Sequence, residues 1–157
     1  MLAMTLARAK ARDVGDRIRA AGEMPALVLG ADTLVVLDQR PLGKPVSHDE
    51  ARAMLRALRG RQHEVVTAVA LRLEAAAGRE VTDAVTSQVV MRDYSDREID
   101  DYVATGEPDD KAGAYAVQGH GAHLVARVEG CYTNVVGLPL GTTARLLRVF
   151  GLAPTDP

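Results

Sequence analysis

The stretch that decides the fold is Ala26-Leu27-Val28-Leu29-Gly30-Ala31-Asp32-Thr33-Leu34-Val35-Val36-Leu37. The apolar run over residues 26–30 is typical of a buried, parallel β-strand. Residues 34–37 continue it in strand-forming residues after the polar pair Asp32-Thr33. We therefore expect Asp32 to lie at the carboxyl end of a strand, which is the edge where open α/β sheets bind ligands.

Helices are predicted on both sides of this stretch. Two capping boxes, Ser47-His48-Asp49-Glu50 and Ser95-Asp96-Arg97-Glu98, predict the starts of helices that end at Gly60 and Gly106. In the first box we expect the Glu50 carboxylate to accept from the Ser47 amide. Hydrophobic periodicity predicts a further helix over residues 2–20, whose apolar face contains Leu2, Leu6, Ala9 and Val14.

Strands and connections fill the rest of the chain. Strands are predicted at 64–73, 81–91 and 122–128, a turn or loop at 38–43, a hairpin connection at 74–79, a loop region at 107–121, a closing helix at 140–149 and a frayed tail at 153–157. The alternation of strands and helices predicts an α/β fold.

Composition excludes several classes of protein. The length of 157 residues suits one domain, and with one Phe and four Tyr the core is expected to consist of Leu, Val and Ala. A net charge of −2 supplies no basic field for nucleic acid. Cys131 is the single cysteine, which excludes an internal disulfide and fits a cytoplasmic location. No apolar run reaches the length of a membrane span.

Two segments carry polar groups that suit phosphate chemistry. A carboxylate at the position of Asp32 can hold a divalent cation or take a proton from an attacking water. Lys44, in Leu42-Gly43-Lys44-Pro45, can meet a phosphate oxygen as a point charge. Each residue also has a plainer interpretation, since Asp32 can be a turn aspartate and Lys44 a solvated lysine.

A third segment, Asp110-Lys111-Ala112-Gly113-Ala114-Tyr115-Ala116-Val117-Gln118-Gly119, combines a lysine, a glutamine and glycines. Glycine-rich backbone can offer its amides to an anion. The Gln118 amide carries one donor group and one acceptor, which match the imide edge of uracil or thymine. The alternative interpretation is a flexible surface loop.

Taken together, these segments resemble the Maf family of nucleoside triphosphate pyrophosphatases. The matching pieces occur in family order and cover most of residues 5–150: Leu6-Ala7-Arg8-Ala9-Lys10-Ala11, Gly30-Ala31-Asp32-Thr33-Leu34-Val35-Val36, Leu42-Gly43-Lys44-Pro45, Ala51-Arg52-Ala53-Met54-Leu55, Leu58-Arg59-Gly60, His63-Glu64-Val65-Val66-Thr67-Ala68-Val69-Ala70, Ile99-Asp100-Asp101-Tyr102-Val103-Ala104-Thr105-Gly106-Glu107-Pro108, the Lys111 segment, Val128-Glu129-Gly130 and Asn134-Val135-Val136-Gly137-Leu138-Pro139.

The resemblance implies a Maf-like α/β fold, with a mixed sheet in two lobes around a central cleft. It implies hydrolysis of a nucleoside triphosphate to the monophosphate and pyrophosphate, aided by Mg²⁺ or Mn²⁺. Asp32 then matches the proton acceptor at the metal and Lys44 a catalytic lysine, with Lys111 on the phosphates. Thr33 and Gln118 match positions tied to base choice, and glutamine there resembles the branch acting on dTTP and UTP. The expected partner is the nucleotide substrate, without nucleic acid or membrane, and a homodimer is left open.

The chain departs from the family pattern in one respect. Family members carry a strand and a Ser-x-Ser-Pro-Arg-Arg phosphate turn before the first matching helix, so we expect residues 1–157 to be a single Maf-like domain truncated at its N-terminus. Arginines of that kind supply charge-assisted bonds worth about 1.5–3 kcal/mol each. We therefore expect residues 1–157 alone to hydrolyse triphosphates poorly. The alternatives are a non-catalytic nucleotide-binding or septum- and growth-regulating module, and a house-cleaning enzyme for purine triphosphates.

Overall fold

The computed structural model describes residues 1–75 and 78–152, which form two compact units. The described residues of the first unit fall within Met1–Thr33, Thr67–Val85 and Gly137–Pro157, and those of the second within Leu34–Val66 and Thr86–Val136. Two units agree with the expectation of two lobes. The predicted tail at 153–157 and the middle of the predicted hairpin connection lie outside the described residues.

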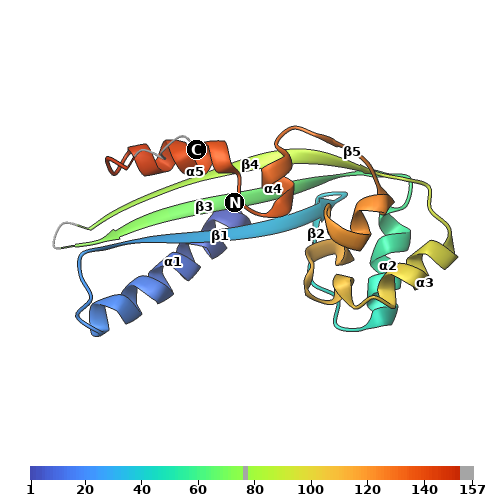
Figure 1. Cartoon of the computed structure of the whole chain (residues 1–157), viewed down its shortest axis with the longest axis horizontal. Coiled ribbons are helices and arrows are strands. Elements are labelled where there is room, and N and C mark those ends of the chain that lie inside the picture. Colours follow the sequence, from blue (N-terminus) through green and yellow to red (C-terminus); the bar gives the residue numbers. More distant parts are fainter. Residues whose placement is uncertain (76–77, 153–157) are drawn as a thin grey trace. The chain divides into compact units, whose positions relative to one another are not determined.

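Among the residues that the structure describes, the sheet has five strands in the order β2-β1-β3-β4-β5, and the predicted α/β class is confirmed. The elements, coloured along the chain in Figure 1, are the helices α1 (Leu2–Ala20), α2 (His48–Leu58), α3 (Asp96–Val103), α4 (Tyr132–Val136) and α5 (Leu140–Arg148), the 3₁₀ helices η1 (Glu107–Asp110), η2 (Ala112–Ala114) and η3 (Gly119–Leu124), and the strands β1 (Ala26–Leu37), β2 (Arg40–Leu42), β3 (Gln62–Glu74), β4 (Arg79–Met91) and β5 (Val125–Glu129).

The strand β1 differs from its prediction in two ways. It runs without a break through Asp32-Thr33, so these residues lie in its interior and not at its carboxyl end. Its pairing with β2 is antiparallel, because a two-residue turn at Asp38-Gln39 reverses the chain between Leu37 and Arg40. The prediction of a parallel strand is therefore wrong for this pair. The prediction of a turn or loop over 38–43 is confirmed at Asp38-Gln39 but wrong for residues 40–42, which form β2. The described pairing of β4 with β5 is also antiparallel.

In the first unit, α1 packs on the sheet through small residues. Its buried residues are Ala3, Ala7, Ala11 and Gly15, whereas Leu2, Leu6 and Val14 are exposed. The predicted apolar face is therefore wrong. The reason is the close approach of α1 to Gly30 of β1, where an added Cβ would lie 2.3 Å from the Ala7 carbonyl oxygen. Only small side chains fit a helix at that separation.

The other face of the sheet in the first unit is covered by α5. Leu146 packs with Val69 and Leu71 of β3, and Leu147 and Phe150 lie against the same cluster. This confirms the three predicted anchors of the closing helix.

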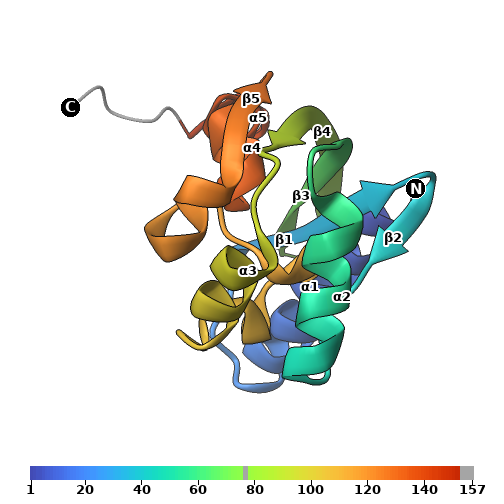
Figure 2. The same cartoon turned by 90° about the vertical axis from the view of Figure 1, so that its right-hand side faces the viewer.

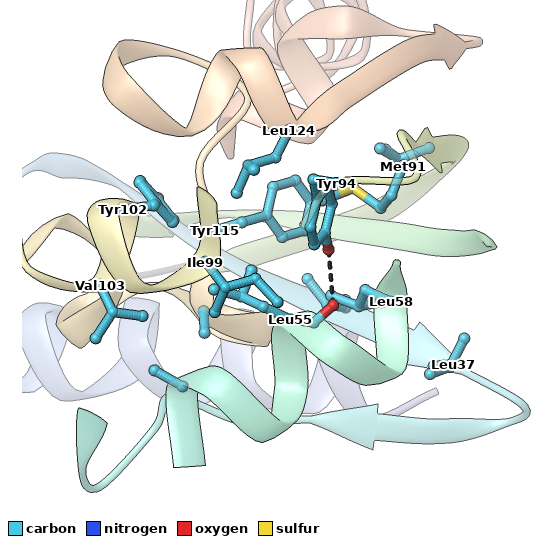
Figure 3. Packing of buried hydrophobic residues seen from close by; sticks show 14 of the residues in the cluster. Leu37, Leu55, Leu58, Met91, Tyr94, Ile99, Tyr102, Val103, Tyr115 and Leu124 are labelled. Atoms are coloured by element: carbon cyan, nitrogen blue, oxygen red, sulfur yellow. Dashed lines mark hydrogen bonds between the residues drawn. The ribbon is translucent and has the colours of Figure 1, made fainter. Parts of the chain in front are cut away.

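In the second unit, α2 and α3 lie beside each other (Figure 2) over a core that contains three tyrosines. The Tyr94 hydroxyl donates to the Leu55 carbonyl at 2.7 Å (Figure 3). Tyr102 and Tyr115 are also buried, so the prediction of a core without aromatics is wrong for this unit. The predicted inward residues of α3, which are Ile99, Tyr102 and Val103, are confirmed.

The capping predictions are confirmed in one case and corrected in part in the other. Ser95 and Glu98 form a full capping box. At the start of α2 the Ser47 hydroxyl accepts from the Glu50 amide as predicted, but the Glu50 carboxylate accepts from the Val46 amide at 2.6 Å instead of the Ser47 amide.

The structure also differs from the prediction in the segment before the last strand and in the segment after it. The segment 107–121 contains the 3₁₀ helices η1 and η2 and the start of η3, and residues 122–124 continue η3, so the last strand begins at Val125. The short helix α4 follows β5. Within the described residues, no helix combines the length and the apolar character that crossing a membrane requires.

His63 is a titratable group inside the second unit. It is 3% exposed, and its Nε2 shares a 2.7 Å hydrogen bond with the Tyr115 hydroxyl. Burial lowers the pKa of His63 from 6.5 to about 4, because the charged imidazolium is poorly solvated there.

This shift predicts acid-dependent stability. Between pH 6.5 and about 4 the unfolded chain binds the His63 proton and the folded chain does not. The free energy of unfolding should therefore fall by up to about 3 kcal/mol as the pH drops through this window. Urea titrations of wild type and His63→Gln at pH 7, 5.5 and 4.5 measure it. We expect a shallower dependence in the variant, and parallel curves would contradict the assignment.

Candidate functional site

Asp32 is held by a lysine of α1. The Lys10 ammonium donates to Asp32 Oδ1 at 2.7 Å and to the Ala31 carbonyl at 3.1 Å. The Asp32 side chain is 14% exposed and that of Lys10 is 58% exposed. The Asp32 carboxylate is thus partly buried, and the Lys10 ammonium, which solvent still reaches, sets its direction. This arrangement is suited to orienting a water molecule or a phosphate oxygen.

Thr33 follows Asp32 on β1, so its side chain points to the opposite face of the sheet. Its hydroxyl shares a 2.8 Å hydrogen bond with the Thr67 hydroxyl on β3. A Cβ added to Gly137 would lie 3.5 Å from Thr33 Oγ1, so this glycine packs close to the threonine. The structure therefore separates the neighbouring candidates Asp32 and Thr33 onto different faces.

Lys44 lies in the exposed loop that joins β2 to α2. The preceding residue, Gly43, accepts a hydrogen bond through its carbonyl from the Gly113 amide at 2.9 Å. At Gly113 φ is +69°, and an added Cβ would lie 2.9 Å from a Val35 methyl group. Glycine at this position lets the Lys111 segment pass close to β1 and brings it against the Lys44 loop.

The charges of both lysines act on Asp110. The Lys111 ammonium donates to the Asp110 carboxylate. This hydrogen bond and the positive charge of Lys111 lower the pKa of Asp110, and the charge of Lys44 contributes in the same direction. The Gly113–Gly43 hydrogen bond thus joins the segments of Lys44 and Lys111 in the second unit, and the exposed Asp110 carboxylate experiences both charges. Two ammonium groups so placed can bind an anion whose negative charge is larger than the single charge of the Asp110 carboxylate.

Gln118 lies directly before η3, with its side chain exposed. The backbone around it is held by hydrogen bonds from Ala116 to Tyr102 and from His120 and Gly121 to Glu107. The alternative interpretation of residues 110–119 as a flexible surface loop is therefore not supported, because the backbone on both sides of Gln118 is hydrogen-bonded to side chains outside this segment.

The prediction from sequence missed Lys10. A lysine on an amphipathic helix is usually solvated, and the helix was expected to pack through leucines. A usable signal was nevertheless present, because Lys10 follows Ala7 by three residues and precedes Ala11 by one. Once Ala7 and Ala11 are taken as the packing face, the same helical face carries Lys10 to β1.

A protein-only metal cage is absent from the described part of the chain, where no three His, Cys, Asp or Glu side chains gather. A single carboxylate can still serve Mg²⁺, which is commonly held by one or two carboxylates together with the phosphates of a substrate. Asp32 is the candidate that fits this donor set.

Comparison with known proteins gives a consistent result. The profile of the Maf-like protein family matches residues 1–150. A dTTP/UTP pyrophosphatase of Dictyoglomus thermophilum is 51% identical over 80% of this chain and 65% of its own length. Proteins of the same name from Anaeromyxobacter dehalogenans and Moorella thermoacetica are each 53% identical over 94% of this chain, and over 72% and 73% of their own lengths. The chain thus spans about two thirds to three quarters of these relatives.

Proposed function

The chain belongs to the Maf-like family, and on that premise we propose that it hydrolyses dTTP and UTP to the monophosphate and pyrophosphate. The name shared by its relatives supports this substrate choice. The observation that carries the proposal is the pairing of Lys10 with Asp32 at 2.7 Å, since it directs a carboxylate within the segment that matches the family acceptor.

Asp32 is assigned to the attacking water. Its carboxylate would orient the water or accept its proton as the oxygen bonds to the α-phosphorus, and pyrophosphate would leave. Lys10 keeps the carboxylate in one direction and adds positive charge where the phosphates would lie.

Lys44 and Lys111 are assigned to the phosphate chain. A triphosphate would compete with Asp110 for Lys111, because phosphate oxygens carry more charge than one carboxylate. Both ammonium groups would then stabilise the charge that develops on the leaving pyrophosphate. Gln118 and Thr33 are assigned to base choice, as in the family members that they match.

We further propose Mg²⁺ or Mn²⁺ as the cofactor, with Asp32 as its protein ligand. Such an ion supplies neutralisation of phosphate charge and a lowered pKa of bound water. The expected location is the cytoplasm, where nucleotides and Mg²⁺ are both present.

The central test is the variant Asp32→Asn, assayed by pyrophosphate release from UTP. Asparagine can still accept from Lys10 but is a poor base, so turnover should fall by about 10²-fold or more while the fold is kept. Asp38→Asn is the control. Asp38 lies in the β1–β2 turn, is exposed and forms an ion pair with Arg61. Wild-type turnover in Asp32→Asn would remove this residue from the mechanism.

The assay is run on residues 1–157 alone and on the same residues preceded by a relative's Ser-x-Ser-Pro-Arg-Arg segment. The joined form should be faster by orders of magnitude, because each added charge-assisted bond is worth about 1.5–3 kcal/mol. Nucleotide binding without turnover in both forms would instead favour a non-catalytic binding module.

Base choice is tested at Gln118. UTP and dTTP should be preferred over ATP, GTP and CTP, because the amide offers both a donor and an acceptor to the imide edge. Gln118→Glu should weaken this preference, since an ionised carboxylate only accepts. Gln62→Glu, which makes the same charge change at another exposed position, is the control. Equal kcat/KM for all five nucleotides, or a preference for purines, would refute the assignment.

A further inference from the structure

Residues 116–121, which include Gln118, are here called the base segment. Two side chains hold its backbone by hydrogen bonds on both sides of Gln118. The Ala116 amide donates to the Tyr102 hydroxyl at 3.2 Å. The His120 and Gly121 amides donate to the Glu107 carboxylate, each at 2.9 Å. Gln118 therefore lies between two fixed points of backbone.

The two side chains act as one unit. The Tyr102 hydroxyl donates to Glu107 Oε1 at 3.0 Å while its oxygen accepts from Ala116. Tyr102 is 1% exposed, and burial together with the nearby Glu107 charge raises its pKa well above its usual value, so the hydroxyl keeps its proton. Burial raises the pKa of Glu107, but the hydrogen bonds from Gly121, His120 and Tyr102 outweigh it and the pKa lies below its usual value. The carboxylate is therefore ionised and can accept all three bonds.

The approach is close enough to require glycine on the segment. Gly119 has a φ of +66°, and a Cβ there would lie 2.6 Å from Glu107 Oε2. A Cβ at Gly121 would lie 2.5 Å from the Ala116 carbonyl oxygen and 2.7 Å from the Tyr102 hydroxyl oxygen. A larger residue at either position would clash, so glycine is what allows the base segment to approach Glu107 and Tyr102 this closely. The Gln118 side chain remains exposed.

We propose that Glu107 is a positioning residue for base recognition, which holds the base segment so that the Gln118 amide meets the imide edge of a pyrimidine in a fixed orientation. The proposal rests on the proposed function, since it concerns the same nucleotide substrate. A glutamine amide distinguishes imide from other base edges only if its oxygen and its NH₂ group keep their places. A loosened segment would let the amide turn and accept other bases.

The test compares Glu107→Gln with Glu98→Gln. Glutamine at 107 has one acceptor oxygen in place of two, so at least one of the three donors loses its partner. Glu98 is the matched control, because its carboxylate likewise accepts a backbone hydrogen bond, from the Ser95 amide at 2.7 Å, at the start of α3. Amide hydrogen exchange at His120 and Gly121 reports the hold on the segment. Dissociation constants of the α,β-methylene analogues of UTP and CTP report selectivity without turnover, because cytosine reverses the donor and the acceptor that uracil presents.

We expect exchange at His120 or Gly121 to quicken about tenfold in Glu107→Gln. The preference for the UTP analogue over the CTP analogue should narrow by about tenfold, through weaker UTP binding. Glu98→Gln should keep the wild-type exchange rates and the wild-type nucleotide preference, even if its thermal midpoint falls as far as that of Glu107→Gln. Unchanged exchange, or faster exchange with an unchanged preference, would overturn the proposal. Failure of wild type to bind either analogue, when it is joined to the Ser-x-Ser-Pro-Arg-Arg segment, would instead overturn the proposed function.

Discussion

The close contact between α1 and β1 is the constraint on which the candidate site depends. Gly30 leaves so little room that a Cβ there would lie 2.8 Å from the Ala11 amide nitrogen. This contact sets the register of helix against strand. Lys10 precedes Ala11 on the helix, and Asp32 follows Gly30 by two residues on the same face of the strand. The 2.7 Å pair between Lys10 and Asp32 is therefore a consequence of packing between an alanine face and a glycine.

Local signals in the sequence predicted most elements of the fold. Ser95 and Glu98 predicted the start of α3, because a capping box needs only neighbouring residues. The packing face of α1 could not be predicted in the same way. Hydrophobic periodicity favours Leu2, Leu6 and Val14, but the helix buries alanines because a glycine on another element allows the closer approach. The 3₁₀ turns of 107–121 also depend on distant partners, since Glu107 joins residues that lie 13 and 14 positions away.

The candidate site shows the same division between local and tertiary information. Asp32, Lys44, Lys111 and Gln118 were found from residue type and the family resemblance. Their partners, Lys10 for Asp32 and Glu107 for the segment around Gln118, were not, because each reaches its target through tertiary contacts. The opposite orientation of Asp32 and Thr33 follows from the two-residue period of a strand, but it required knowing that β1 continues through them.

The central claim is that Asp32 directs water at the α-phosphorus, with pyrophosphate as the leaving group. The most direct measurement is hydrolysis of UTP in ¹⁸O-enriched water, with the products separated and weighed by mass spectrometry. Attack at the α-phosphorus places the label in UMP and leaves the pyrophosphate unlabelled. Label in pyrophosphate or in inorganic phosphate would show attack at another phosphorus and would contradict this account.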